Sequence, residues 1–553
     1  MASVAALKAE GNSLFGAKNF VDAEKKYTGA IEASASADSK GLAVLYANRS
    51  ACRLSLKRYL DANADATKAT DLDPTYAKAH ARLATSEDQL GAPHKSKESW
   101  QKALDALPKT NLTPAEETQK TQYTAGLRAA ISALAQLNNT KHYIPNANPR
   151  QPGGTPFIWQ GNGRMPWDLA APIVARLRNE PKTPDNLRSS AWVIHHAYED
   201  WTNGLNMIRQ VKVLDERTGA MTGMIGAIAH ITNGIMRDPR VMHIPDNEFI
   251  GQYNKQITLE AFQTKAWTEA GPEIIIKEAL ERQRTQGWDA TRPALSITIR
   301  AWIMRSMMSL GLYQQHQVAV EFYRNCLTVI RTLRDHWILE SKDDRGVIFE
   351  KSFIFGIQGL YLDALMQSYH SSNGAESLEV LSNLFKEAKV LIREINETSG
   401  QPREHDPADP GFLSSFFLYP KGEAYAMKGF YYNKMALKSG NDPKEFFRKA
   451  AQEYLTAASA YPEDDEHHPS FLNAALGHMF SAGTFPLREI MDVMKRIRLS
   501  VPKAKAIWER SSLGAGGVWD IFAGVEKEEQ KLRTSIAEGQ CTLDSCVGIA
   551  GEN

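Results

Sequence analysis

Cysteine is scarce in this chain, which has four cysteines among 553 residues. Cys52 and Cys326 lie far apart within apolar helical patterns, and we expect both to be buried thiols. Cys541 and Cys546 are separated by four residues of a polar segment without a nearby histidine, which is not the spacing of a zinc site. The cysteines therefore do not predict a disulfide framework. They fit a reducing compartment, cytosolic or nuclear, and we expect the protein to be cytoplasmic.

An excess of charge of one sign is also missing. The formal net charge is +1, so no overall field favours nucleic acid or an anionic membrane. No apolar run reaches the ~20 residues of a membrane span, and the most apolar one, residues 220–236, is expected to be a buried helix. The N-terminal "MASVAALKAEGNSLF" carries charges too early for a signal peptide. We expect no nucleic acid and no membrane among the partners.

A residue spacing of four and then three occurs three times in the first hundred residues. It is carried by Ala23, Tyr27 and Ala30, by Ala62, Ala66 and Ala69, and by Ser96, Trp100 and Ala103. The triplets begin 39 and 34 residues apart, each follows an apolar-periodic segment, and prolines follow the last two. This pattern predicts three helix–turn–helix units, in which the small residues mark close helix approach. Residues 113–137 predict a helix that covers the open end, with Thr113 as its N-cap.

These repeats resemble the tetratricopeptide repeat. The resemblance covers residues 4–108, or 4–137 with the capping helix. It implies an all-α superhelix of three repeats, in which the first helix of each repeat lines a concave groove.

Five polar residues fall on these first helices. They are Lys8 and Asn12 in the first repeat, Asn48 in the second, and Lys78 and Arg82 in the third. The set contains three cations, two amides and no acid, and the paired residues are four apart, so each pair shares a helix face. Such a site suits two closely spaced carboxylates, because the cations supply charge and the amides donate hydrogen bonds. The C-terminal acidic residue of a peptide offers that pair.

The same five residues match the dicarboxylate clamp of the tetratricopeptide-repeat co-chaperones, and "LKAEGNSLF", "LYANRSAC" and "YAKAHAR" resemble its three segments. The resemblance implies binding of the terminal Glu-Glu-Val-Asp of seventy- or ninety-kilodalton heat-shock chaperones. By this resemblance, Lys8, Asn12 and Asn48 would hold the main-chain carboxylate. Lys78 would take the terminal Asp side chain, and Arg82 would steady the groups upstream.

The length of the chain favours roughly two to four domains. Residues 1–137 form the predicted clamp domain, and residues 138–167, rich in proline and glycine, read as a linker whose aromatic residues dock onto a neighbouring surface. Residues 168–538 are helical in pattern without alternating strands, and residues 539–553 form a polar tail. An alternative divides the helical region into 168–290 and 291–538.

Within this region, the patterns predict long helices that include one over 259–284. Ala450, Tyr454 and Ala457 repeat the second-helix spacing of the N-terminal units. We therefore expect degenerate tetratricopeptide-like repeats, although no named family is apparent over 168–553.

Signals for chemistry after residue 168 are weak. His195 and Glu199 lie four apart on one helix, but no second pair completes a metal site, so a packed or hydrogen-bonded histidine is expected. The segment "PEDDEHHP" (462–469) predicts a solvated acidic helix cap. No phosphate loop, zinc-protease helix, nucleophile elbow or kinase motif is found. We predict no catalytic residue, no cofactor and no metal.

The sequence thus favours a non-enzymatic adaptor or co-chaperone that binds a chaperone tail through its N-terminal domain and an unidentified protein through its C-terminal half. Two alternatives stay open. One is a tetratricopeptide scaffold without chaperone binding. The other is an enzyme with an unrecognised helical domain after residue 168, suggested only by the size of that region and by the cluster of His195, His196, Glu199 and Asp200.

Overall fold

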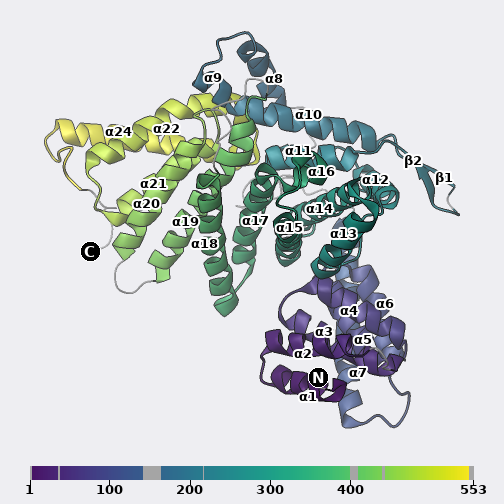
Figure 1. Cartoon of the computed structure of the whole chain (residues 1–553). Helices are drawn as coiled ribbons and strands as arrows, with labels where there is room; N and C mark the ends of the chain where they lie inside the picture. The colour runs from purple at the N-terminus through teal and green to yellow at the C-terminus, as the bar shows by residue number, and fades with distance from the viewer. Residues whose placement is uncertain are drawn as a thin grey trace. The chain divides into compact units, whose positions relative to one another are not determined.

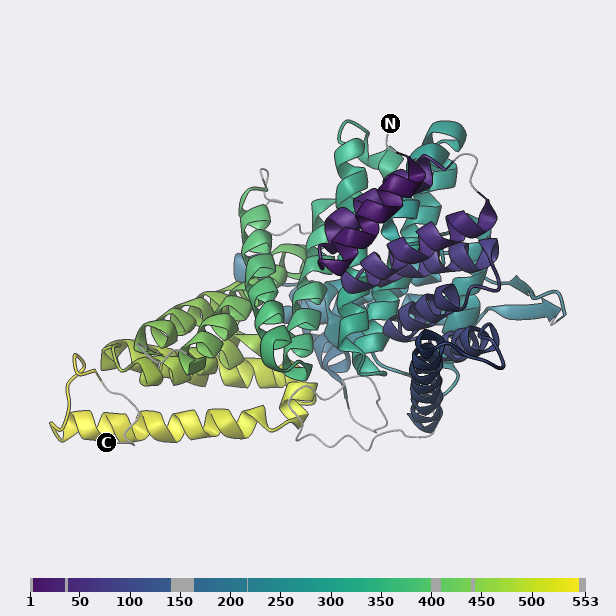
Figure 2. The same cartoon turned by 90° about the horizontal axis from the view of Figure 1, so that it is seen from below.

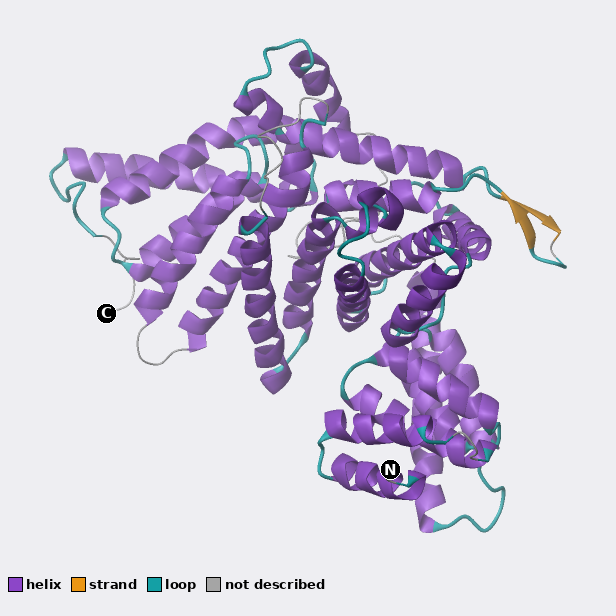
Figure 3. Ribbon diagram, viewed as in Figure 1, coloured by secondary structure: helices purple, strands orange, loops and turns teal. Residues whose placement is uncertain are grey.

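The structure, a computed structural model, describes residues 3–34, 38–140, 164–215, 217–398, 409–438 and 443–546. Its contacts divide the chain into two compact units, Met1–Ile144 with Thr264–Glu340, and Pro145–Gln263 with Ser341–Asn553. Grouping residues 264–340 with the N-terminal repeats is not indicated by the sequence. Both units are helical almost throughout (Figures 1 and 3), which confirms the all-α prediction.

Three antiparallel helix pairs open the first unit. They are α1 (Val4–Gly16) with α2 (Phe20–Glu32), α3 (Ser39–Ser55) with α4 (Tyr59–Leu72), and α5 (Ala77–Gln89) with α6 (Pro93–Asp105). Each helix contacts the next along the chain, and the pairs follow one another from purple to dark blue in Figure 2. Every residue of the three predicted triplets is buried. The predicted tetratricopeptide array is confirmed.

The capping helix α7 (Pro114–Thr140) packs against α6, as predicted. Thr113 begins it: its Oγ1 accepts from the backbone N–H of Glu116 (3.3 Å), and its own N–H donates to the Glu116 carboxylate (2.8 Å). This reciprocal pair satisfies backbone donors that a helix start leaves unpaired. Thr113 is therefore the N-cap that the sequence predicted.

Close approach of α1 and α2 depends on Gly11. A Cβ atom at this position would lie 2.8 Å from the ring of Tyr27, which is closer than van der Waals contact allows. The ring of Tyr27 is buried and packs directly on the α1 backbone at this point. Gly11 is thus required by packing rather than by backbone conformation.

Gly11→Ala is expected to lower the free energy of unfolding of the first unit by about 1–3 kcal/mol, because the added methyl overpacks the contact with Tyr27. The matched control is Gly16→Ala on the same helix, where a Cβ would meet nothing within 4 Å. That change should be neutral or stabilise by up to ~1 kcal/mol. Urea unfolding followed by circular dichroism measures both, and equal stability of the two variants would contradict the packing argument.

Helices α13 (Pro272–Gln286), α14 (Trp288–Gly311) and α15 (His316–His336) complete the first unit. The single helix predicted over 259–284 is wrong. Helix α12 (Phe249–Thr264) ends before Lys265, which has a left-handed backbone with φ of 53°, and α13 begins at Pro272 after a break. Proline favours the first position of a helix, so the chain starts a new one there.

The second unit contains the remaining elements. They are α8 (Pro166–Leu177), α9 (Pro184–Arg188), α10 (Ser190–Ile208), β1 (Lys212–Asp215), β2 (Ala220–Thr222), α11 (Ala227–Arg237), η1 (Pro239–Val241), α12, α16 (Lys342–Arg345), η2 (Val347–Phe349), α17 (Lys351–Ser371), α18 (Gly374–Asn396), η3 (Ser414–Leu418), α19 (Tyr419–Lys438), α20 (Pro443–Ala460), α21 (His467–Ala482), α22 (Leu487–Trp508), α23 (Ser512–Ala515) and α24 (Val518–Ala537). Helices α17 to α22 pack successively, each on the next (Figure 1).

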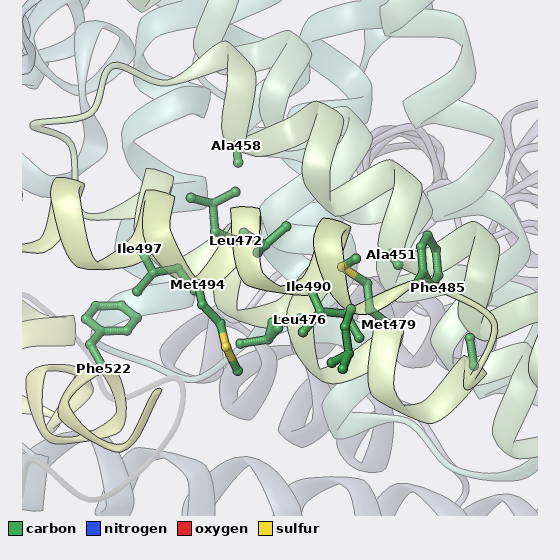
Figure 4. Close-up of a cluster of buried hydrophobic side chains, with 13 residues drawn as sticks. Ala451, Ala458, Leu472, Leu476, Met479, Phe485, Ile490, Met494, Ile497 and Phe522 are labelled. Carbon is green, nitrogen blue, oxygen red and sulfur yellow. The ribbon is translucent and has the colours of Figure 1, made fainter. Parts of the chain in front are cut away.

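A hydrophobic core lies between α20, α21, α22 and α24. Leu472, Leu476 and Met479 of α21 meet Ile490 and other apolar side chains of α22 (Figure 4). Burial of these side chains removes apolar surface from water and stabilises this end of the array. Apolar packing alone therefore accounts for the burial of these side chains.

The pair α19 and α20 repeats the packing of the first repeat. Ala450 and Ala457 are fully buried, and a Cβ at Gly429 would lie 2.8 Å from the ring of Tyr454. Gly429 and Tyr454 thus make the contact that Gly11 and Tyr27 make in the first repeat. This shared contact supports the tetratricopeptide-like reading of the C-terminal helices.

The apolar run 220–236 is only partly helical. Its first residues form β2, which pairs with β1 in an antiparallel hairpin, and α11 begins after Gly226. The backbone of Gly226 has φ of 103°, a conformation open chiefly to glycine, so the chain turns there before the helix starts. Among the described residues, this hairpin contains the strands that the sequence did not predict (Figure 3).

The predicted linker falls largely on residues 141–163, which lie outside the described residues. At its end, Trp167 is buried in α8 and stacks on Tyr198 and His243, with ring centroids 5.0 and 4.9 Å away. Of the predicted polar tail, residues 547–553 are not described, and Leu543 and Ser545 accept backbone hydrogen bonds from the start of α22. In the described ranges, no helix has the length and apolar character required to cross a membrane.

Candidate carboxylate-binding site

The structure places the predicted clamp residues on the first helix of each repeat. Lys8 and Asn12 lie on α1, Asn48 on α3, and Lys78 and Arg82 on α5. The Arg82 guanidinium donates to Asn48 Oδ1 (3.4 Å), and Asn48 Nδ2 donates to Asn12 Oδ1 (3.3 Å). One side chain from each repeat is thereby connected. Lys8 and Lys78 lie one helical turn before Asn12 and Arg82.

Among the described residues, no acidic side chain pairs with the three cations of this set. In the part of the chain that the structure describes, no carboxylate lies within ion-pair distance of Lys8, Lys78 or Arg82. Desolvation lowers the pKa of the Arg82 guanidinium, and the chief electrostatic influences on it come from tyrosines, not from a carboxylate. Positive charge at this site is therefore available to a ligand.

Other arginines of the same repeats are fully paired. Arg49 contacts the buried Asp65 carboxylate (2.7 Å), and Arg53 contacts both Glu24 (2.8 Å) and Asp65 (3.0 Å). These acids lie on the second helices, α2 and α4. Acidic side chains thus pair with Arg49 and Arg53, whereas the cations among the predicted clamp residues contact no acid in the described part of the chain.

Helices α13 and α15 add to this paired network. Glu273 of α13 forms ion pairs with Arg53 and Arg58, and the Glu321 carboxylate of α15 accepts from the backbone N–H of Tyr59 (3.0 Å). These contacts join residues more than 200 positions apart in the chain. No local signal in the sequence could have indicated them.

Tyr27 is a polar contributor that the sequence suggested only as a core residue. Its hydroxyl donates to Asn12 Oδ1 (2.7 Å), while its ring fills the space left by Gly11. Burial raises the pKa of Tyr27 to about 12, so the phenol keeps its proton at physiological pH. A core residue of the first repeat, Tyr27, thus hydrogen-bonds directly to Asn12, one of the predicted clamp residues.

The tetratricopeptide-like pair of the second unit does not repeat the clamp residues. Lys8 precedes Gly11 by three positions and Asn12 follows it by one. The same offsets from Gly429 give Ala426 and Phe430, which offer neither charge nor amide. The packing glycine is shared by the two pairs, but the polar side chains are not.

The histidines near the start of α10 are held in pairwise contacts. His195 contacts Glu199 (3.3 Å), and His196 contacts Asp409 (3.4 Å). Arg237 contacts Asp409 at 2.6 Å and so supplies a cation to the same acid. Across the described ranges, no group of three or more histidine, cysteine or acidic side chains is arranged to hold a metal ion.

The prediction of a solvated acidic cap at 462–469 is wrong. Asp465 and Glu466 are 0 % and 1 % exposed, and both contact the Arg240 guanidinium, at 2.8 and 3.2 Å. Although burial alone would raise it, Arg240 and His467 hold the pKa of Asp465 well below its ordinary value. Arg240 lies more than 200 positions earlier in the chain, so no local pattern indicates this counter-charge.

Part of the chain is similar to curated proteins of known type. Heat shock protein STI1 of Saccharomyces cerevisiae is 35% identical over 141 residues, which cover 25% of this chain and 23% of that protein. The Hsp70-Hsp90 organizing protein of Triticum aestivum is 38% identical over 128 residues, which cover 23% of this chain and 19% of that protein. The chain thus spans less than a quarter of the length of either relative. No family model matches the chain.

A solved structure covers more of the chain at lower similarity. The myosin chaperone UNC-45 from C. elegans in complex with a Hsp90 peptide is 12% identical over 98% of this chain and 70% of that chain, with a TM-score of 0.26. A score this low does not establish a common overall shape. The sequence relatives, together with the three observed repeats and their capping helix, show instead that part of this chain is similar to the tetratricopeptide-repeat co-chaperones.

Proposed function

We propose that this protein is an adaptor that binds the carboxylate-rich C-terminal tail of a heat-shock chaperone through Lys8, Asn12, Asn48, Lys78 and Arg82. The observation that carries the proposal is electrostatic. Three cations of the first helices have no acid in contact among the described residues, while neighbouring arginines are paired with buried carboxylates. A ligand that brings two carboxylates would supply the missing charge.

The Glu-Glu-Val-Asp end of a seventy- or ninety-kilodalton chaperone has the required chemistry. In this proposal, Lys8, Asn12 and Asn48 hold the main-chain carboxylate, and Lys78 takes the side chain of the terminal Asp. Arg82 steadies the groups upstream. The name of one sequence relative, the Hsp70-Hsp90 organizing protein, agrees with such a partner. The proposed role is binding rather than catalysis, in the cytoplasm, with residues 168–538 engaging a further protein.

The full chain is expected to bind a Glu-Glu-Val-Asp peptide with micromolar affinity, because charge-assisted bonds of ~1.5–3 kcal/mol each are offset by ordering of the flexible peptide. Calorimetric titration with the free-acid peptide and with its C-terminally amidated form measures this. Amidation removes one carboxylate and should weaken binding at least about tenfold. Affinity for the free acid should also fall as salt is raised.

Equal affinity for the two peptides would contradict the proposal, because it would show that the terminal carboxylate is not recognised. A peptide with the same residues in scrambled order and an amidated end serves as the control for nonspecific attraction. Its affinity should be lower still.

A further inference from the structure

The hydrogen bonds among the clamp residues have a defined direction. An arginine side chain only donates, so the atom of Asn48 that faces Arg82 must be its oxygen. The amide nitrogen of Asn48 then faces Asn12, and the Asn12 atom in contact with it must be the acceptor Oδ1. The chain of bonds therefore runs from Arg82 through Asn48 to Asn12.

Tyr27 donates a further hydrogen bond to Asn12, at the end of this series. Its hydroxyl donates to the same Asn12 Oδ1, at 2.7 Å, which is shorter than either of the other two bonds. The position of the hydroxyl is fixed because the Tyr27 ring packs on Gly11, the residue beside Asn12 in α1. Two donors thus converge on one amide oxygen.

In this arrangement the amide oxygens of Asn12 and Asn48 already accept hydrogen bonds, whereas amide N–H groups of the same residues remain available to donate to a ligand. Asn12 Oδ1 receives two bonds and Asn48 Oδ1 receives one, all from within the protein. In the described structure, Asn12 Nδ2 donates to no protein acceptor, and Asn48 Nδ2 donates only one of its two hydrogens. A site of this kind presents hydrogens to a ligand and suits an anion that only accepts.

We propose that Tyr27 is a positioning residue which locks the Asn12 amide with its nitrogen toward the ligand and thereby makes the site prefer an ionised carboxylate over a neutral amide. This inference rests on the proposed function, since it assigns the selectivity of the same site. Without the tyrosine hydroxyl, the Asn12 amide loses its shortest bond and can turn its oxygen to the ligand. An oxygen there repels a carboxylate but accepts from an amide.

The test is Tyr27→Phe in the full chain, titrated with the free-acid and the amidated tail peptides. The ring that packs on Gly11 is kept, so the melting temperature should change little. Affinity for the free acid should fall about 5- to 10-fold while affinity for the amidated peptide stays the same, so the preference between them falls by the same factor. A merely structural role would weaken both peptides equally.

Tyr46→Phe is the matched control, because Tyr46 lies on α3 of the same array and its hydroxyl makes no hydrogen bond among the described residues. It should keep the wild-type preference. Asn12→Asp supplies a second test that does not depend on Tyr27. It retains an oxygen for the two donors but replaces the free nitrogen by a second oxygen, and should reverse the preference toward the amidated peptide.

Two results separate the possible failures. If the wild-type chain prefers the free acid and Tyr27→Phe keeps that preference in full, the positioning role is overturned while the proposed function stands. If the wild-type chain shows no preference, the proposed function itself fails and this inference fails with it.

Discussion

Replacing Lys78 by glutamate is expected to weaken binding of the free-acid tail peptide by about 100-fold or more. The lysine lies on α5, is exposed, and contacts no acid among the described residues, so its charge is available to the ligand. The change removes a charge-assisted bond of ~1.5–3 kcal/mol and adds repulsion between two carboxylates. Calorimetric titration at low salt, where such pairs are least screened, measures the loss.

The control for net charge is Lys97→Glu. Lys97 is also exposed, but it lies on α6, a second helix of its repeat, and so away from the clamp residues. The Lys97→Glu substitution alters the net charge by the same amount as Lys78→Glu, and should change the affinity for the peptide less than about threefold. Similar losses in the two variants would show that the peptide is attracted by overall charge, with no specific role for Lys78.

Replacing Arg240 by alanine is expected to lower the free energy of unfolding of the second unit by about 3–5 kcal/mol. This guanidinium contacts Asp238, Asp465 and Glu466, all of them buried, and lies over the ring of Trp508 at 3.6 Å. Its removal takes away the main counter-charge of these buried carboxylates and leaves Asp465 with His467 alone, which costs far more than the loss of an exposed pair. Urea unfolding followed by tryptophan fluorescence reports the change.

Arg448→Ala is the matched control, since Arg448 forms an exposed ion pair with Glu445 at 2.8 Å on α20. Its loss should change the stability by less than ~1 kcal/mol, because water solvates both partners once they separate. A small effect for Arg240→Ala as well would mean that the buried acids take up protons at little cost. In that case the stability of the variant would rise as the pH is lowered.

The repeats could be predicted because their signal is local. Small residues and aromatics at spacings of four and three report one helix face, and Thr113 with Glu116 three positions later reports a helix start. The candidate clamp residues were named partly from helix spacing, since Lys8 with Asn12 and Lys78 with Arg82 share a helix face, and partly from the resemblance to the tetratricopeptide-repeat co-chaperones. The break between α12 and α13 was missed although Gly271 and Pro272 mark a helix start within the predicted span; the left-handed backbone of Lys265 has no such signal in the sequence.

The prediction for the acidic segment 462–469 was wrong for a different reason. Six polar or charged residues in a row are normally solvated, and only a buried partner of opposite charge changes this. The partner, Arg240, belongs to η1 and meets the segment only after the chain has folded. The contacts of Glu273 with Arg53 and Arg58 are of the same kind.

By itself, the sequence determined the helical class of this protein and its three N-terminal repeats, because periodicity and spacing act within a few helical turns. Only the tertiary structure decided which arginines receive acids and which stay available to a ligand. It also decided that Tyr27 bonds to Asn12 and that Arg240 neutralises a buried acidic segment. The reason is physical: pairing of charges and direction of hydrogen bonds depend on distances between side chains that the order of residues does not set.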